Sequence, residues 1–263
     1  MSKYKLRKIV SAIITIVVLA SIFGFNIPNL KSIISSGSPA AETASAEARS
    51  VDVTDYANTA ISFTTEDGNQ ISIPQFDGSS YTYTVNDNTP YFTTEDLTFS
   101  GTYVTFSNLD DYGRAQVASA VLGPETMQTH ERGDISDIHP SGWWEAKASD
   151  VNVNRCHLIG NQLGGDQTDT SFNMVTGARH FNTPVMTDYE NPTADYIEKT
   201  GNHVRYRVTP VFENNDSTCH GVLMEAESIE DGGTGLKFCV YCYNIQPGYV
   251  CDYQIGEWSK LDG

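Results

Sequence analysis

The residues between 152 and 190 combine side-chain types that could hydrolyse a phosphodiester bond. In chain order these residues are Asn154, Arg155, His157, Asn173, Arg179, Asn182 and Glu190. A neutral histidine can take a proton from water, and an arginine can neutralise the negative charge that grows on phosphorus. An asparagine oxygen suits Mg²⁺, which prefers oxygen ligands and keeps most of its waters. The stretch therefore predicts phosphodiester hydrolysis assisted by one metal ion.

A strand, a loop and a helix are expected to position these side chains. Residues 152–159 have the pattern of a strand that runs into a glycine-rich loop. The helix is expected to begin at Thr183, a candidate N-cap followed by proline, and to continue to about Lys199, before Gly201. Pro192 lies inside this helix and should kink it or split it in two.

The rest of the chain is predicted to be mostly strand and turn. Residues 51–107 alternate polar with β-branched or aromatic side chains, and residues 113–122 have helical spacing. Three further strands are expected, over residues 203–212, 221–228 and 236–244. The expected fold class is therefore α+β, an antiparallel sheet with the strand, loop and helix unit at its centre.

The stretch Asn154–Ile159, of sequence NRCHLI, resembles the DRGH-type motif of the DNA/RNA non-specific endonucleases, which have a ββα-metal fold. The chain is most similar to the branch of secreted or surface-bound streptococcal DNases and DNA-entry nucleases. Further blocks match that branch in order: residues 113–115, 140–143, 173–182, 186–190, 203–210 and 243–248. Each block alone is a weak signal, but their order and spacing over residues 80–250 are specific.

The resemblance implies a role for each of four residues. His157 would be the general base that activates water, and Arg155 would contact the phosphate or position the neighbouring loop. Asn182 would be the direct protein ligand of a single Mg²⁺, for which Mn²⁺ is an alternative. Glu190 would hold a water bound to that metal. Taken one by one, each could instead be structural: Asn182 as a helix cap and Arg155 as an ion-pair partner.

Four other residues are predicted to bind substrate. Asn173 and Arg179 match family positions around the site. Arg205 and Arg207 share one face of an expected strand, because side chains alternate along a strand, so they could form a ridge that contacts phosphate. The alternative for these arginines is a role in the scaffold.

Two positions depart from the wider family. Where that family has Asp and Gly, this chain has Asn154 and Cys156. The first change removes a negative charge near the catalytic residues, and the second puts a thiol next to the base. The streptococcal branch looks similar at both positions, so an active enzyme is still expected.

Net charge argues against strong binding to nucleic acid. Residues 51–263 contain 10 Lys+Arg and 31 Asp+Glu, a net charge of −21. Such a body should repel polyanions except where a few arginines and a bound cation make a local positive patch. We therefore expect few phosphate contacts and only mild salt dependence.

The N-terminus has the features of an export signal. Four cations within the first eight residues precede an apolar run that ends at about Phe25. Residues 1–26 are predicted to be a signal peptide or an N-terminal membrane anchor, since the run is long for a cleaved signal and slightly short for a membrane span. Residues 27–50 are predicted to be a flexible linker and residues 51–263 the endonuclease domain. The expected location is secreted, or extracellular and anchored to the membrane.

Export would permit disulfides. Four of the five cysteines, Cys219, Cys239, Cys242 and Cys251, cluster near the C-terminus, and one or two disulfides are expected among them. Cys156 is the candidate free thiol. A zinc site built on the C-terminal cysteines is the weaker alternative, because one CxxC pair in a strand-like stretch is a weak zinc signal.

These features predict an exported, Mg²⁺-dependent endonuclease that cleaves DNA without sequence preference, with RNA left open as a second substrate. One alternative is a surface nucleic-acid-binding module that keeps the fold without activity; the intact catalytic set argues against it. The second alternative is a secreted antibacterial nuclease toxin. The export signal and the lack of a long delivery domain make this alternative the weaker one. No obligate protein partner is predicted, and membrane contact is expected only through an uncleaved N-terminal segment.

Overall fold

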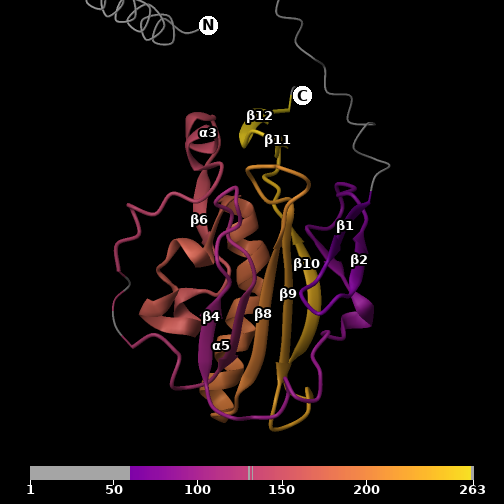
Figure 1. The fold of residues 1–263 in the computed structure, drawn as a ribbon, viewed down its shortest axis with the longest axis vertical. Coiled ribbons are helices and arrows are strands. Elements are labelled where there is room, and N and C mark those ends of the chain that lie inside the picture. The colour runs from indigo at the N-terminus through magenta and orange to yellow at the C-terminus, as the bar shows by residue number, and fades with distance from the viewer. Residues whose placement is uncertain (1–59, 130, 132, 262–263) are drawn as a thin grey trace, which may run out of the picture. The chain divides into compact units, whose positions relative to one another are not determined.

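The computed structural model describes residues 60–129, 131 and 133–261 (Figure 1). The predicted signal or anchor, the linker and the first residues of the endonuclease domain lie outside the described residues, so these boundaries stay predictions. None of the described helices is long and apolar enough to cross a membrane.

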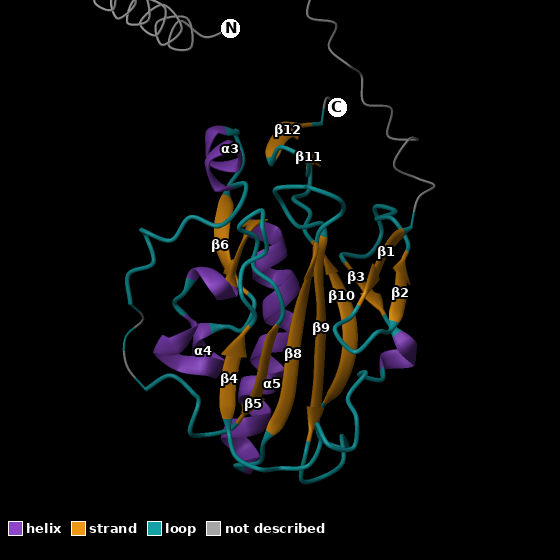
Figure 2. Cartoon of the chain, viewed as in Figure 1, coloured by secondary structure: helices purple, strands orange, loops and turns teal. Residues whose placement is uncertain are grey.

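A six-stranded antiparallel sheet forms the centre of the described region (Figure 2). Its strands, in spatial order, are β3 (Thr82–Thr84), β10 (Lys237–Tyr243), β9 (Gly221–Ser228), β8 (Val204–Val211), β5 (Ala118–Leu122) and β4 (Tyr103–Phe106). The three strands predicted over residues 203–244 are confirmed as β8, β9 and β10. The sheet is antiparallel throughout and a few helices accompany it, which confirms the α+β class.

The two faces of this sheet bury different residues because side chains alternate along each strand. On one face, Val204, Tyr206 and Val208 of β8 join a core that also contains Ala194 and Ile197 of helix α5 (Thr187–Thr200). We call this the helix-side core. The opposite face carries a smaller far-side core, which includes Ile61, Ile71, Ile73, Leu223 and Tyr241. Both faces of the central strands are therefore buried.

A strand, strand and helix unit packs on the helix-side core. Strand β6 (Val153–His157) pairs antiparallel with β7 (Met174–Ala178), and helix α5 follows after a π-helical segment, η5 (Phe181–Met186). The strand expected over residues 152–159 is confirmed. This arrangement is the ββα unit that the resemblance implied.

Helix α5 departs from the sequence expectation at its start and at its proline. Thr183 has an extended backbone (φ −146°, ψ 116°), and the regular helix begins at Thr187. Pro192 neither splits nor interrupts the helix, which continues to Thr200. The end before Gly201 is confirmed, since this glycine has φ +71°, a left-handed conformation that favours glycine after a helix.

Short elements complete the described region. They are the hairpin of β1 (Ile61–Thr64) and β2 (Gln70–Ile73), the hairpin of β11 (Tyr249–Asp252) and β12 (Glu257–Lys260), helices α3 (Trp143–Ala148) and α4 (Asn161–Gly164), and 3₁₀ turns η2 (Asn86–Asn88), η3 (Gly165–Thr168) and η4 (Ser171–Asn173). Helix α4 and the turns η3 and η4 lie between β6 and β7, where a loop without helices was predicted.

The helix predicted over residues 113–122 is wrong. Strand β5 occupies the second half of this stretch and pairs with both β4 and β8. Ala118, Ala120 and Leu122, at period 2, all join the helix-side core. Burial between two strands outweighs the helix propensity of the alanines, which is a weak preference of under about 1 kcal/mol per residue.

The predicted disulfides are also wrong, because all five cysteines are free and buried. Cys239 and Cys242 are three residues apart in β10 and therefore point to opposite faces of the sheet. Cys239 belongs to the far-side core, whereas Cys242, Cys219 and Cys251 belong to the helix-side core. The opposite orientation also excludes Cys239 and Cys242 as joint ligands of one zinc ion.

Candidate active site

One large surface cavity, of about 710 Å³, brings together four of the predicted site residues. They are Arg155 and His157 of β6, Asn182 of η5 and Glu190 of α5. The ββα unit explains this convergence, since β6 ends at His157 while η5 and α5 contribute Asn182 and Glu190 to the same cavity. The wall is completed by Gln128, Ile135, His139, Trp143, Trp144, Lys147, Val153, Asn154, Gly160, Asn161, Gln162, Thr187 and Asn191.

His157 is the last residue of β6 and is 7% exposed. Its Nε2 lies 2.8 Å from Oδ1 of Asp169, which follows the η3 turn. A carboxylate in this position accepts the proton on Nε2, so the neutral ring carries its lone pair on Nδ1. The pair therefore has the geometry of a histidine base oriented by a carboxylate.

Asn173 holds the strand exit that presents His157. Its side chain is fully buried; Oδ1 accepts from the Ile159 amide at 2.9 Å, and Nδ2 donates to the carbonyls of Ile159 and Thr168 at 3.0 Å. With these bonds made, Asn173 has no surface to offer a substrate. The structure gives it a supporting position behind Ile159, two residues after His157, and not the substrate contact predicted from the sequence.

Arg155 connects β6 to the loop before helix α3. Its guanidinium donates to the carbonyl oxygens of Ile138 and Ser136 and lies 4.0 Å from the ring centre of Trp143. Of the two roles that the resemblance left open, this geometry corresponds to positioning the neighbouring loop. Its charge still faces the cavity, where Lys147 of α3 adds a second cation.

Glu190 is a buried carboxylate to which the described part of the chain offers no partner. It is 7% exposed, and burial raises its pKa to about 7. No described residue donates a hydrogen bond to it, and desolvation alone accounts for the shift. Gly160 lies against it, since a Cβ there would be 3.2 Å from three carboxyl atoms of Glu190.

Two amide side chains line the same cavity. Asn182 is half-buried, and its Nδ2 donates to Oγ1 of Thr183 at 3.2 Å. Asn161 is buried, and no described residue makes a hydrogen bond to its Oδ1. The Glu190 carboxylate and these two amide side chains on one cavity wall are hard oxygen donors, which fits a divalent cation such as Mg²⁺.

Arg179 lies outside the cavity. Its side chain is exposed, and its amide donates to the Asn152 carbonyl at 2.8 Å, which extends the pairing of β6 with β7. The structure does not bring this arginine to the cavity.

Arg205 and Arg207 do share one face of β8, as predicted, but it is the face opposite the helix-side core. Both are buried. Arg207 pairs with Asp67 and with Glu225, which is 2.8 Å from its Nε, and Arg205 pairs with Asp96 at 3.1 Å. These ion pairs neutralise the two cations, and the sheet separates them from the cavity. The predicted phosphate ridge is therefore corrected to a pair of buried structural arginines.

The two departures from the motif have separate outcomes. Cys156 is fully buried in the helix-side core, and burial raises the pKa of its thiol well above the usual value. Because neighbouring strand residues point to opposite faces, this thiol does not face the same side as His157. Asn154 lies on the cavity wall, where it places a neutral side chain.

Sequence reasoning missed Asp169 and Asn161. Asp169 is twelve residues after His157, and Asn161 opens the short helix α4. Both fall in the stretch predicted as a loop, where polar residues are common. The only available signal was their presence between the two motif strands, which does not distinguish them from the other polar residues there.

Comparisons with known proteins converge on nucleases. A family model described as DNA/RNA non-specific endonuclease matches residues 93–230. The magnesium-bound structure of NucA from Streptococcus agalactiae is 26% identical with a TM-score of 0.59, over 68% of this chain and 87% of that chain. The Sda1 nuclease with bound zinc is 21% identical with a TM-score of 0.55, over 70% and 97%, a likeness that concerns the fold. No curated protein matches the chain.

Proposed function

Because the chain belongs to the DNA/RNA non-specific endonuclease family, whose model spans more than half of it, we propose that it is an exported, Mg²⁺-dependent endonuclease that acts on DNA. Membership makes it a hydrolase of phosphodiester bonds in nucleic acid. The metal, the roles of individual residues, the preference for DNA and the export are parts of the proposal.

The observation that carries the proposal is the meeting of His157, Asn182 and Glu190 in one cavity. His157 takes a proton from the attacking water, and Asp169 holds its ring in the required tautomer. The water attacks phosphorus opposite the leaving 3′ oxygen. Arg155 and Lys147 supply positive charge at the cavity wall, against the charge that develops on the phosphate.

Asn182 would bind the cation directly, and Glu190 would hold it through a metal-bound water. When bound, a divalent ion would polarise the phosphate and offset negative charge in the transition state. The partnerless, buried carboxylate of Glu190 supports this assignment, since a cation would compensate its ionisation. The magnesium bound in NucA, the relative at 26% identity, supports the choice of Mg²⁺.

Export is proposed from the N-terminal sequence alone. Basic residues followed by an apolar run predict a signal peptide or anchor over residues 1–26. The proposed location is secreted, or extracellular and held to the membrane by this segment. Fractionating cells that express the full chain tests it, because protein confined to the cytoplasm would refute export.

Cleavage of a supercoiled plasmid by the purified full chain tests the activity. We expect cleavage with Mg²⁺, none with EDTA, and a loss of at least about 100-fold in His157→Ala and Asn182→Ala. Glu198→Gln, an exposed position on α5, is the matched control and should retain full activity. Cleavage that survives His157→Ala would remove this residue from the base role. A parallel assay on single-stranded RNA determines the substrate range.

A further inference from the structure

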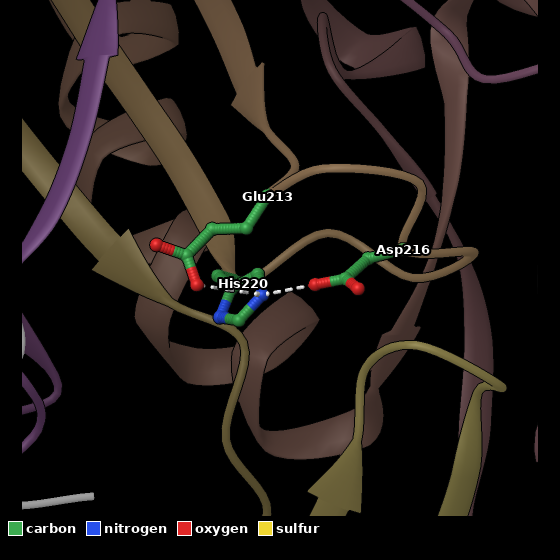
Figure 3. A group of neighbouring side chains, drawn as sticks. All are labelled: Glu213, Asp216 and His220. Atoms are coloured by element: carbon green, nitrogen blue, oxygen red, sulfur yellow. Dashed lines mark hydrogen bonds and ion pairs between the residues drawn. The ribbon is translucent and has the colours of Figure 1, made fainter.

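The loop between β8 and β9 carries a second group of side chains suited to a metal. Glu213, Asp216 and His220 point toward one another from this loop (Figure 3). One potential ligand atom from each lies within 4.8 Å of the other two. Nε2 of His220 is 2.7 Å from Oδ2 of Asp216 and 3.8 Å from Oε2 of Glu213.

We propose that Glu213, Asp216 and His220 form a metal site that takes a zinc ion and stabilises the fold, separate from the active site. Zinc binds imidazole nitrogen and carboxylate oxygen at about 2.0–2.2 Å, so tetrahedral ligand atoms are roughly 3.3–3.5 Å apart. The separations of His220 Nε2 from the Asp216 and Glu213 oxygens, 2.7 and 3.8 Å, lie on either side of this range. The nitrogen ligand favours zinc over Mg²⁺ or Ca²⁺, which prefer oxygen.

The backbone that carries the carboxylates is already fixed. Glu213 and Asp216 enclose a turn in which the Asp216 amide donates to the Glu213 carbonyl at 2.9 Å, with Asn214 at φ +45°. Arg114 donates from Nη1 to the carbonyls of Asn214 and Asp216, each at 3.0 Å. A ligand pair on a braced turn loses less conformational entropy on binding than a pair on a free loop.

The imidazole is fixed as well. His220 donates its amide to the Val211 carbonyl at 2.8 Å and accepts from the Asn244 amide at 2.9 Å. Its ring stacks on Tyr253, with centroids 4.0 Å apart and planes 25° apart. The stack holds the ring while its Nε2 faces the two carboxylates.

The charge around the cluster favours a cation. In the part of the chain that the structure describes, neither Glu213 nor Asp216 pairs with a lysine or arginine. The nearby Arg114 directs its ion pair to Asp110 instead, at 2.7 Å. Among the described residues, the two carboxylates therefore share one imidazole as their partner, and a divalent ion would balance the excess negative charge.

The site is distinct from the active-site cavity, which none of the three residues lines. It adjoins that cavity's wall through Thr218, whose Oγ1 lies so close to Gly142 that it leaves no room for a Cβ there. Gly142 immediately precedes helix α3, which contributes Trp143 and Trp144 to the cavity. A bound ion would fix the loop against which α3 begins.

Zinc content measured by mass spectrometry tests the proposal. The full chain carrying Asn182→Ala, which weakens the proposed active-site metal, is incubated with zinc chloride, gel-filtered and analysed. Adding Glu213→Gln and Asp216→Asn to that protein should remove one zinc per chain. Zinc at about 100 times its Kd should raise the Tm of the Asn182→Ala protein by about 5–10 °C. It should leave the Tm of the protein with the two added substitutions unchanged.

Glu257→Gln, an exposed carboxylate on β12, is the matched control and should keep the zinc. If the double change prevents folding, Glu213→Gln alone is the milder change, because Glu213 is the most exposed of the three. It should weaken zinc binding by more than about tenfold, because a charged ligand is lost. Equal zinc content, or equal Tm shifts, in proteins with and without the substitutions would overturn the site. Plasmid cleavage with Mg²⁺ by Glu213→Gln should stay within about twofold of the parent, which separates this site from the proposed nuclease mechanism.

Discussion

Replacing Glu190 by glutamine is expected to stabilise the metal-free protein at alkaline pH while weakening its binding of the cation. The carboxyl group is buried without a partner in the described region, so its ionisation is costly in the folded state. Glutamine has nearly the same shape and carries no charge. The residue that we assign to the metal is thus expected to reduce stability when the metal is missing.

The magnitude follows from the two pKa values. Burial raises the pKa of Glu190 from 4.5 to about 7, a difference of 2.5. Each pKa unit corresponds to about 1.4 kcal/mol, so the folded state loses about 3 kcal/mol relative to the unfolded state when this group ionises. Between pH 4.5 and about 7 the folded state binds more protons than the unfolded state. The free energy of unfolding therefore falls as pH rises through this window and levels off above about 7.

Urea unfolding in EDTA at pH 4.5 and pH 8.5 measures this effect. Glu190→Gln should exceed the parent by about 3 kcal/mol at pH 8.5 and by little at pH 4.5. Glu198→Gln, an exposed position on the same helix, should match the parent at both pH values. Saturating Mg²⁺ should close the gap at pH 8.5, because only the parent gains from the ion.

A stability difference between Glu190→Gln and the parent that is the same at both pH values would refute the reasoning, because ionisation of Glu190 would not be its cause. A Glu190→Gln protein less stable than the parent at pH 8.5 would show that an unseen donor satisfies the carboxylate. Either result would also remove the physical argument for placing the cation there.

Three other changes test separate parts of the structure. Asp169→Asn should lower kcat by about 10- to 1000-fold with little change in KM, because an amide does not fix the tautomer of the base; a change confined to KM would contradict this. Gly160→Ala should raise the Mg²⁺ concentration needed for half-maximal cleavage, because its Cβ would press on Glu190; an unchanged metal titration would count against it. Arg207→Met should cost about 3–5 kcal/mol in urea unfolding, because it leaves the fully buried Glu225 without its cation; a loss under 1 kcal/mol would show that the pair is dispensable.

Local pattern was enough to predict the elements that carry the site. Strand β6 and strands β8 to β10 are rich in apolar, β-branched and aromatic residues, and the motif around His157 located the end of β6 that lines the cavity. Strand β5 could not be predicted in this way. Its alanines favour a helix locally, and only the flanking strands β4 and β8 make it a strand.

The errors at the site have a common origin in long-range pairing. That Arg205 and Arg207 share a face follows from the sequence, but which face it is depends on where α5 packs. Their partners Asp96 and Asp67 are more than a hundred residues away. The same limit applies to Asp169, which becomes a partner of His157 only through the turns between β6 and β7.

The arrangement of the three tryptophans provides an intrinsic optical reporter of the cavity. Trp143 and Trp258 are 5% and 4% exposed, whereas Trp144 is 63% exposed and lies on the cavity wall, stacked on His139 with ring centres 4.5 Å apart. Fluorescence from the two buried indoles lies at shorter wavelength and resists collisional quenching. The longer-wavelength fluorescence that a quencher removes therefore comes from Trp144. A nucleotide base that stacks on this ring shields it from acrylamide. Occupancy of the cavity can thus be followed in unlabelled protein, without turnover.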